Sequence, residues 1–225
     1  MATIHILRHG QALHNVQRGY PYRDPPLTEL GIQQAKNVQL PAQPDLIIVS
    51  PMTRTIQTTL LVFRDLLNAS PAKVKVEVWP ELRECYDAVC NQGVSRAAIS
   101  AKFPQFDFSC CDEEWDYPPH TALDAYNRAE LVRRRLKSVS RFYDNILVVT
   151  HRCFISFLAK GARFDVCECR SYKFLYENEF SYKEETDEMR YGANCDTGEL
   201  QDFGPNVLLP AFPARKDDEA LPLET

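Results

Sequence analysis

The sequence contains no apolar run long enough to cross a lipid bilayer, which takes about 18–20 consecutive residues. No signal peptide precedes the first expected strand, which begins almost at Met1. An excess of positive charge is also missing. The formal net charge is −5, which argues against a general nucleic-acid surface. We therefore expect neither a membrane nor a nucleic-acid partner, and a location in the cytosol, or in the cytosol and nucleus.

Metal-binding patterns are equally scarce. The sequence has no pair of CxxC motifs that could frame a zinc site, and no obvious cage of carboxylates. Its eight cysteines are Cys85, Cys90, Cys110, Cys111, Cys153, Cys167, Cys169 and Cys195. Without a secretion signal we expect these to be reduced, structural thiols, with disulfides or an incidental metal site as the alternative. We expect no metal and no other cofactor.

The composition that is present is ordinary for a globular protein, with 44% hydrophobic and 25% charged residues in a chain of 225. We see no internal repeat, and no linker before about residue 180. We therefore expect one domain over residues 1–203, with an irregular insertion at 91–120 that has the character of a lid or specificity loop. Residues 204–225 are expected to form an extended, partly mobile tail. The sequence leaves the oligomeric state open.

Short apolar runs predict five strands, at residues 3–7, 45–50, 74–79, 145–150 and 171–176. The run at 45–50 is nearly continuous, as in strands buried within a parallel sheet. Helical spacing predicts helices over residues 28–40, 51–67 and 124–143, and a buried helix beginning near residue 153. Thr28 is a plausible N-cap of the first helix, and Ser50 with Pro51 is predicted to begin the second.

Charged side chains follow the ends of four consecutive strands. Arg8 and His9 follow the first, and Arg54 lies in the first turn of the helix after the second. Glu84 comes shortly after the third strand, and His151 directly follows the fourth. Ligands of open α/β sheets bind outside the carboxyl ends of the strands, so we expect these side chains to meet at one edge.

Such a set of side chains suits phosphoryl transfer. Guanidinium groups match phosphate oxygens bidentately, and an imidazole can form a covalent phospho-enzyme. A second imidazole, if protonated, can hold charge that develops on the phosphoryl oxygens, and a carboxylic acid can protonate the leaving oxygen. Each residue alone has a plain structural explanation, which we retain for His5, His14 and His120. The coincidence of the others at one edge favours a site.

Five ordered motifs resemble those of the histidine phosphatase superfamily, the phosphoglycerate mutase-like group. They are Leu7-Arg8-His9-Gly10-Gln11 with Asn15, Leu27-Thr28 with Gly31, Ser50-Pro51 with Arg54, Gln57 and Thr58, Leu82-Arg83-Glu84, and Val148-Val149-Thr150-His151. The resemblance covers about residues 3–176. It implies an α/β fold, a three-layer α/β/α sandwich around a mostly parallel sheet.

The resemblance also implies roles for single residues. His9 would be the phosphorylated nucleophile, and Glu84 would be the proton donor, with Glu81 as a less favoured candidate. The phosphate would be held by arginine, imidazole and amide side chains: Arg8, Arg54, His151, Gln11 and Asn15. No metal is needed for this chemistry.

One position departs from the pattern of the resembled family. Arg152 stands where the family usually has glycine after its second histidine, and where the backbone amide touches phosphate. Its side chain either enters the pocket and favours a more acidic substrate, or points to solvent or an acidic neighbour. We expect the second outcome, because another close arginine would be repelled by Arg8 and Arg54.

The sequence therefore favours a metal-independent phosphomonoester hydrolase that works through a phosphohistidine on a small phosphorylated metabolite. A phosphoglycerate-type mutase is the first alternative. The region 91–120 lacks the paired arginines expected of a glycolytic mutase, which disfavours that reading. The second alternative is a non-catalytic protein that binds a phosphorylated ligand.

Overall fold

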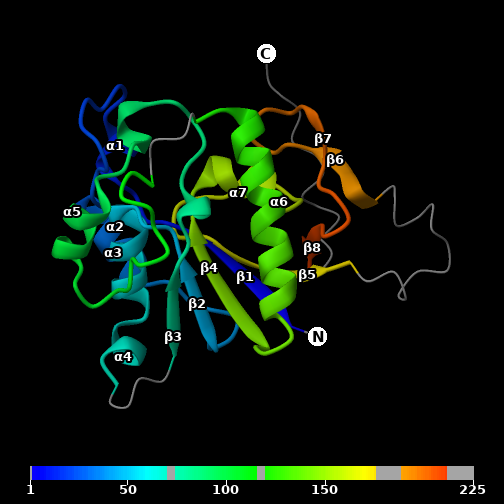
Figure 1. The fold of residues 1–225 in the computed structure, drawn as a ribbon, viewed down its shortest axis with the longest axis horizontal. Coiled ribbons are helices and arrows are strands. Elements are labelled where there is room, and N and C mark those ends of the chain that lie inside the picture. The colour runs from blue at the N-terminus through cyan, green and yellow to red at the C-terminus, as the bar shows by residue number, and fades with distance from the viewer. Residues whose placement is uncertain (1, 70–73, 116–119, 176–188, 212–225) are drawn as a thin grey trace.

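A computed structural model describes residues 2–69, 74–115, 120–175 and 189–211. Its centre is a six-stranded sheet in the order β3-β2-β4-β1-β5-β8 (Figure 1). The strands are β1 (Thr3–Arg8), β2 (Leu46–Val49), β3 (Lys75–Val78), β4 (Asn145–Thr150), β5 (Cys169–Phe174) and β8 (Leu208–Pro210). The five strands predicted from the apolar runs are all present, each within two residues of its expected bounds.

The first four strands of the chain run parallel to one another, whereas β5 and β8 are antiparallel to their neighbours. Arg8 at the end of β1 lies opposite Thr150 at the end of β4. Val49 of β2 lies opposite Val149 of β4 and Val78 of β3. The carboxyl ends are therefore aligned, and the residue that follows each strand emerges at the same edge.

Helices cover both faces of the sheet, because successive side chains of a strand point to opposite faces. Ile4 and Ile6 pack into one core with α6 (Ala122–Val139) and α7 (Arg152–Leu158). Leu7 and Val49 pack into a second core with α3 (Thr53–Val62) and α5 (Arg96–Lys102), and α2 (Glu29–Lys36) packs on α3. This is the expected three-layer α/β/α sandwich (Figure 1). No helix in the described parts of the chain is long and apolar enough to span a membrane.

Thr28 caps α2 as the sequence predicts, because its hydroxyl accepts a 3.0 Å hydrogen bond from the N–H of Gly31. Gly31 also permits a close backbone contact. A Cβ built on it would lie 1.9 Å from the carbonyl oxygen of Gln11, which only a glycine avoids. The loop after His9 therefore rests directly on the first turn of α2. The short helix α1 (Leu13–Val16) follows in the chain, directly after this loop.

The start of α3 differs from the prediction. The helix begins at Thr53 with Met52 as its N-cap, two residues later than expected. Ser50 caps nothing. Asp24 supplies the cap instead, since its carboxylate accepts hydrogen bonds from the Thr53 backbone N–H at 2.8 Å and from the Thr53 hydroxyl at 2.6 Å. Sequence reasoning could not find this cap, because it comes from a loop 29 residues earlier.

The segment from β3 to α6 is more ordered than the irregular insertion expected at 91–120. It contains η1 (Pro80–Leu82), η2 (Val89–Asn91) and α5, while residues 116–119 lie outside the described residues. Several of its apolar side chains are buried in the second core: Ile99, Phe103, Phe106, Phe108 and Trp115. The described part of this segment is therefore an integral part of the domain.

The domain also extends past the boundary expected at residue 203. β6 (Tyr191–Ala193) and β7 (Leu200–Asp202) form a separate two-stranded ribbon, and β8 then pairs with β5 in the central sheet. Val207 and Leu208 are fully buried there. Pro205 precedes this short apolar run and Pro210 ends it. An edge strand tolerates proline, but the two prolines make the strand hard to recognise in the sequence. Residues 212–225 of the expected tail lie outside the described residues.

Candidate active site

Two strand-end histidines lie side by side at the carboxyl edge of the sheet. His9 follows β1 and His151 follows β4, and these strands are neighbours in register. The centroids of the two imidazole rings are 5.1 Å apart, with an edge-on arrangement. Both side chains are almost completely buried. The sheet therefore brings together the two imidazoles that the sequence predicts.

His9 has a defined tautomer. Its Nδ1 lies 2.7 Å from the carbonyl oxygen of Gly10. A carbonyl oxygen can only accept, so Nδ1 carries the hydrogen and donates. Burial lowers the pKa of His9 well below its usual range, and the charges of Arg54 and Arg8 lower it further. The ring is therefore neutral near pH 7, and the lone pair of Nε2 is available as a nucleophile.

Arg54 and His151 are hydrogen-bonded to each other. Arg54 lies in the first turn of α3 and donates through Nε to Nδ1 of His151 over 3.3 Å. Because that nitrogen accepts, the neutral ring carries its hydrogen on Nε2, which lies 2.9 Å from the hydroxyl oxygen of Ser50. Burial, followed by the charge of Arg54, lowers the pKa of His151 well below its usual range. His151 is therefore a neutral donor rather than an imidazolium.

Arg54 itself is fully buried. Its two terminal nitrogens donate to the carbonyl oxygen of Cys90 and to the side-chain oxygen of Asn91, each over 3.2 Å. Burial lowers the pKa of Arg54, and the carboxylates of Asp24 and Glu84 act in the opposite direction. These bonds fix the plane of the guanidinium beside the two histidines.

Arg8 approaches from the end of β1. Its Nη1 donates to the carbonyl oxygen of Phe164 over 2.7 Å, whereas its buried Nε has no hydrogen-bond partner among the described residues. Burial lowers the pKa of Arg8 to about 10, and the nearby charge of Arg152 adds to this effect. A buried donor without an acceptor is costly, and an anion at this edge would satisfy it.

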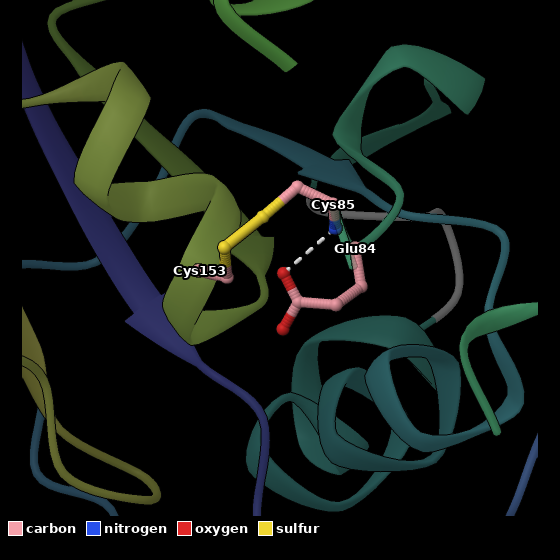
Figure 2. Close-up of side chains that lie close together, drawn as sticks. All are labelled: Glu84, Cys85 and Cys153. Carbon is pink, nitrogen blue, oxygen red and sulfur yellow. Dashed lines mark hydrogen bonds between the residues drawn. A yellow bond between two sulfur atoms is a disulfide. The ribbon is translucent and has the colours of Figure 1, made fainter. Parts of the chain in front are cut away.

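Glu84 is buried at the same edge and is held through one oxygen. Its Oε1 accepts hydrogen bonds from the backbone N–H groups of Cys85 and Phe154, each over 3.0 Å. Figure 2 shows this carboxylate beside the N-terminal part of α7, the helix that begins after His151. Its charge reaches both Arg8 and Arg54 and partly opposes the lowering of their pKa values.

Arg128 of α6 holds the loop that carries Glu84. One guanidinium nitrogen donates to the carbonyl oxygens of Glu81 and Arg83, over 2.6 and 2.8 Å. Nη2 reaches the carbonyl oxygen of Glu84 over 3.4 Å, and Nε pairs with Asp124 over 2.7 Å. His120 binds the same carbonyl of Glu84 over 3.2 Å. The position of Glu84 is thus set by α6 as well as by β3.

Glu81, the less favoured candidate for the acid, is engaged elsewhere. Its Oε1 pairs with Nη1 of Arg135 over 2.9 Å, on the outer part of α6. The guanidinium of Arg135 in turn stacks on the ring of Trp79, 3.8 Å from its centroid. This arrangement directs Glu81 toward α6 and favours Glu84 as the carboxyl group of the site.

The expectation of reduced cysteines is wrong for one pair. Cys85 and Cys153 are joined by a disulfide, with their Cα atoms 6.0 Å apart (Figure 2). The two cysteines are 68 residues apart and belong to no motif, so only the fold reveals that the loop of Glu84 and α7 meet. The other six cysteines are free. The bond therefore links the segment of Glu84 to the helix after His151.

Glu84, Cys85 and Cys153 form the one group of metal-ligand type that occurs in the described parts of the chain. Zinc binds cysteine as the thiolate, and both of these sulfur atoms are used in the disulfide. In this oxidised form the group offers a single carboxylate, which does not make a metal site.

The three remaining predicted site residues lie around this centre with varied partners. The side-chain oxygen of Gln11 accepts from the Thr28 hydroxyl over 2.9 Å. Asn15 caps the backbone N–H of Ala12 over 2.9 Å and is exposed. Arg152 lies with its Nε 3.2 Å from Oδ1 of Asp196. These contacts favour the acidic-neighbour outcome for Arg152 and leave Gln11 and Asn15 as parts of the first loop.

Sequence reasoning missed four residues that build this site. Ser50 binds His151, Asp24 caps α3, Arg128 holds the loop of Glu84, and His14 lies beside His9 with ring centroids 5.9 Å apart. Ser50 and His14 lie within or next to the quoted motifs, so their positions were a usable signal. Asp24 and Arg128 act from distant segments and gave no local signal.

The arrangement has a clear chemical capability. A neutral imidazole with a free Nε2 lies among two buried guanidiniums and a second imidazole that donates through N–H. A carboxyl group lies at the same edge. Such a site can bind a phosphoryl group, accept it on nitrogen and exchange a proton with an ester oxygen.

Comparisons with known proteins show which sequences and folds this chain resembles. A protein of Schizosaccharomyces pombe that is named as a phosphatase is 28% identical over an alignment of 203 residues. The match covers 79% of this chain and 92% of that protein. An α-ribazole-5′-P phosphatase from Escherichia coli has a similar structure, with a TM-score of 0.56 and 22% identity over 78% of this chain and 92% of that one. The ecdysone phosphate phosphatase of Bombyx mori, solved with tungstate, gives a TM-score of 0.59 and 16% identity over 77% and 89%.

The two solved structures show the fold, and the family is shown by a sequence model. The model for the histidine phosphatase superfamily (branch 1) matches residues 4–174, which span all five motifs. The match contains both histidines, both arginines and the carboxyl group described above. The chain therefore belongs to the histidine phosphatase superfamily, as a phosphatase-like or phosphoglycerate mutase-like enzyme.

Proposed function

We propose that this protein is a metal-independent phosphomonoester hydrolase that acts on a small phosphorylated metabolite through a phosphohistidine at His9. The observation that carries this proposal is the 2.7 Å hydrogen bond from Nδ1 of His9 to the Gly10 carbonyl. It directs the lone pair to Nε2, while Arg8 and Arg54 supply positive charge next to the ring. A nucleophile surrounded by cations fits an attack on a phosphate ester.

In the first step, Nε2 of His9 forms a bond to phosphorus as the bond from phosphorus to the ester oxygen breaks. Glu84 gives its proton to the departing oxygen, which leaves as an alcohol. Oε1 of Glu84 is occupied by two backbone N–H donors, so Oε2 is the oxygen that carries the transferable proton. Arg8 and Arg54 hold the phosphoryl oxygens. The Nε2–H of His151 joins them by exchanging the Ser50 hydroxyl for a phosphoryl oxygen when the ester binds.

In the second step, water attacks the phosphorus of the phosphohistidine, and the nitrogen–phosphorus bond breaks. The Glu84 carboxylate takes a proton from the water, which restores its acid form and releases inorganic phosphate. The guanidinium groups provide the positive charge that a metal ion supplies in other phosphatases. Gln11 and Asn15 are further hydrogen-bonding neighbours at the mouth of the site.

A small ester is the proposed class of substrate. The Escherichia coli and Bombyx mori structures are named for phosphate esters of single small molecules. The site of this chain lies at the end of a sheet, with the segment 85–115 beside it. Through Cys90 and Asn91 that segment also contacts Arg54, so it is the part of the chain best placed to select the substrate.

The experiment that tests the proposal has two readouts. Brief incubation with phosphorylated substrate should label His9 with an acid-labile, base-stable phosphoryl group, and a panel of phosphorylated metabolites should release inorganic phosphate at a rate unaffected by EDTA. Undiminished labelling in His9→Ala would refute the nucleophile. If phosphate only moved from one position to another within a sugar acid, and this reaction required a bisphosphate primer, the protein would be a mutase. If no ester turned over, the protein would be a binding protein.

A further inference from the structure

His14 lies beside the nucleophile, although the sequence gave it no role. It belongs to α1, and its ring is tilted by 46° to that of His9, with 5.9 Å between the ring centroids. Its side chain is partly buried at the same sheet edge. An imidazole differs from an apolar ring at this position by its two ring nitrogens, which can donate or accept hydrogen bonds.

The neighbouring amide defines the tautomer of His14. The side-chain oxygen of Asn15 accepts from the N–H of Ala12, which leaves the amide nitrogen of Asn15 facing Nε2 of His14 over 3.1 Å. An amide nitrogen only donates, so Nε2 of His14 accepts and Nδ1 carries the hydrogen. Asn15 thereby orients the imidazole and determines which nitrogen can donate.

That Nδ1–H has no acceptor in the part of the chain that the structure describes. The atom is buried and makes no hydrogen bond within the described residues. Buried donors are nearly always paired, and a lone one calls for a partner that is not part of the chain. The nearby buried Nε of Arg8 lacks a partner in the same way. Two such donors at one edge indicate a ligand with several acceptor oxygens.

The surrounding charge specifies the sign of that ligand. Burial lowers the pKa of His14 to about 3, and the positive charges of Arg54, Arg8 and Arg152 contribute to the shift. His14 is therefore a neutral donor within a positively charged site. An apolar ring at this position would pack on His9 equally well without leaving a donor unpaired.

We propose that His14 is a substrate-contacting residue, whose Nδ1–H donates to an oxygen of the phosphoryl group both in the bound ester and on phosphorylated His9. This inference rests on the proposed function, because it assigns a further donor to the same site. It adds a third imidazole to the groups that hold the phosphoryl oxygens, and it gives Asn15 the task of orienting that imidazole.

Three substitutions separate the hydrogen-bonding role from packing. His14→Asn places an amide nitrogen near the position of Nδ1, His14→Gln places it near Nε2, and His14→Phe keeps the ring without a donor. Binding of inorganic phosphate and of orthovanadate is measured by calorimetry, and kcat/KM is measured on the best substrate of the panel. We expect His14→Phe and His14→Gln to weaken anion binding about tenfold or more, and His14→Asn to stay within about threefold of wild type.

The result that overturns the inference is equally defined. A folded His14→Phe protein that binds phosphate as tightly as wild type refutes it. An equal loss in all three variants with a matching fall in Tm also refutes it, since packing alone would then explain the effect. Calorimetry needs no turnover, so a wild type that binds phosphate but hydrolyses nothing refutes the proposed function and still tests His14. A wild type that binds neither anion refutes both.

Discussion

The backbone N–H of Phe154 donates to Oε1 of Glu84 over 3.0 Å, so the loop after β3 and the helix after His151 share one hydrogen bond. With the N–H of Cys85, this bond occupies Oε1 and leaves Oε2 of Glu84 for other partners. A main-chain donor of α7 therefore holds the Glu84 carboxyl group next to the helix that follows His151.

Glu84→Gln should slow hydrolysis of esters with poor leaving groups by roughly 10²–10⁴-fold, because it keeps the shape but removes the transferable proton. Activated aryl phosphates, whose leaving group scarcely needs a proton, should be affected much less. Steady-state kinetics on both substrate types checks this. Glu81→Gln is the matched control and should leave both rates nearly unchanged. Equal losses on both types would show that Glu84 positions the ligand instead.

Arg128→Met should destabilise the protein by about 3–5 kcal/mol, because it leaves the buried carbonyl oxygens of Glu81 and Arg83 without this donor. Asp124 keeps its ion pair with Arg83. It should also lower kcat for unactivated esters more than for aryl phosphates, since the loop of Glu84 loses its support. Urea unfolding and kinetics on the two substrate types test the two effects. A variant with unchanged selectivity between them would show that Arg128 supports the fold but not the acid.

Alkylation of the unfolded, unreduced protein should modify six of the eight cysteines, because Cys85 and Cys153 are joined. Cys153→Ser should then cost roughly 4 kcal/mol of stability, as expected when a cross-link over a long loop is removed from the unfolded state. Mass spectrometry and urea unfolding measure these quantities. Cys195→Ser serves as the control for loss of a thiol outside the pair. Eight alkylated cysteines would contradict the bond.

Arg152→Gly should leave kcat/KM for simple monophosphates within about threefold, well under 1 kcal/mol. The reason is that Arg152 lies against Asp196, a carboxylate that also pairs with Arg163 over 3.3 Å. Kinetics on monophosphates with and without a second anionic group provides the measurement. A loss of tenfold or more, limited to the more acidic substrates, would instead make Arg152 a specificity residue.

Stability should fall as the pH is lowered below about 6.5, the usual pKa of histidine in unfolded chains. Burial lowers the folded-state pKa of His9 and His151, so the unfolded state binds more protons in this window. The stabilisation is complete above the unfolded pKa and is lost as the pH falls toward the folded one. Burial also lowers the pKa of His14 to about 3 and lowers that of His5, which adds to this effect. The raised pKa of buried Asp24 acts in the opposite direction, so the measured slope is the net of these groups.

Urea unfolding at pH 7.5, 6.5 and 5.5 measures that slope, and His151→Gln should make it shallower.

The pH dependence of activity should also reflect the lowered pKa of His9. The nucleophile must be unprotonated, and the lowered pKa of His9 moves loss of kcat/KM on the acid side well below pH 6.5. Loss of activity with a midpoint near 6.5 would show that His9 is not protected from protonation.

The strands and the groups that follow them could be predicted because each depends on local sequence. An apolar run predicts a strand, and parallel strands must deliver the next residue to one edge, so His9 and His151 could be placed together without a structure. The Cys85–Cys153 bond, the Asp24 cap and the pairing of Arg152 with Asp196 depend on segments far apart in the chain. Their partners are set by packing of the whole domain, which no local pattern encodes.

Local rules also gave one wrong helix start. Ser50 and Pro51 have the residue types of an N-cap and first helical position, yet the helix begins later. The reason is functional geometry, because the Ser50 hydroxyl is used by His151. A preference of about 1 kcal/mol for a cap is outweighed when another residue, here Asp24, caps the helix instead.

Arg128 and His120 hold both ends of one segment of the chain, and this determines where the sequence can change. The segment from Cys85 to His120 begins next to Glu84 and ends next to it again, since His120 binds the carbonyl oxygen of Glu84. Arg128 binds the same carbonyl oxygen. Both ends of the segment are thus held at its base. Because closing a longer loop adds little entropic cost, the exposed positions between these ends can be exchanged or extended with Glu84 left in place, provided that the side chains in the second core and the contacts to Arg54 are kept. The same catalytic frame can in this way be matched to different esters by changes confined to one stretch of chain.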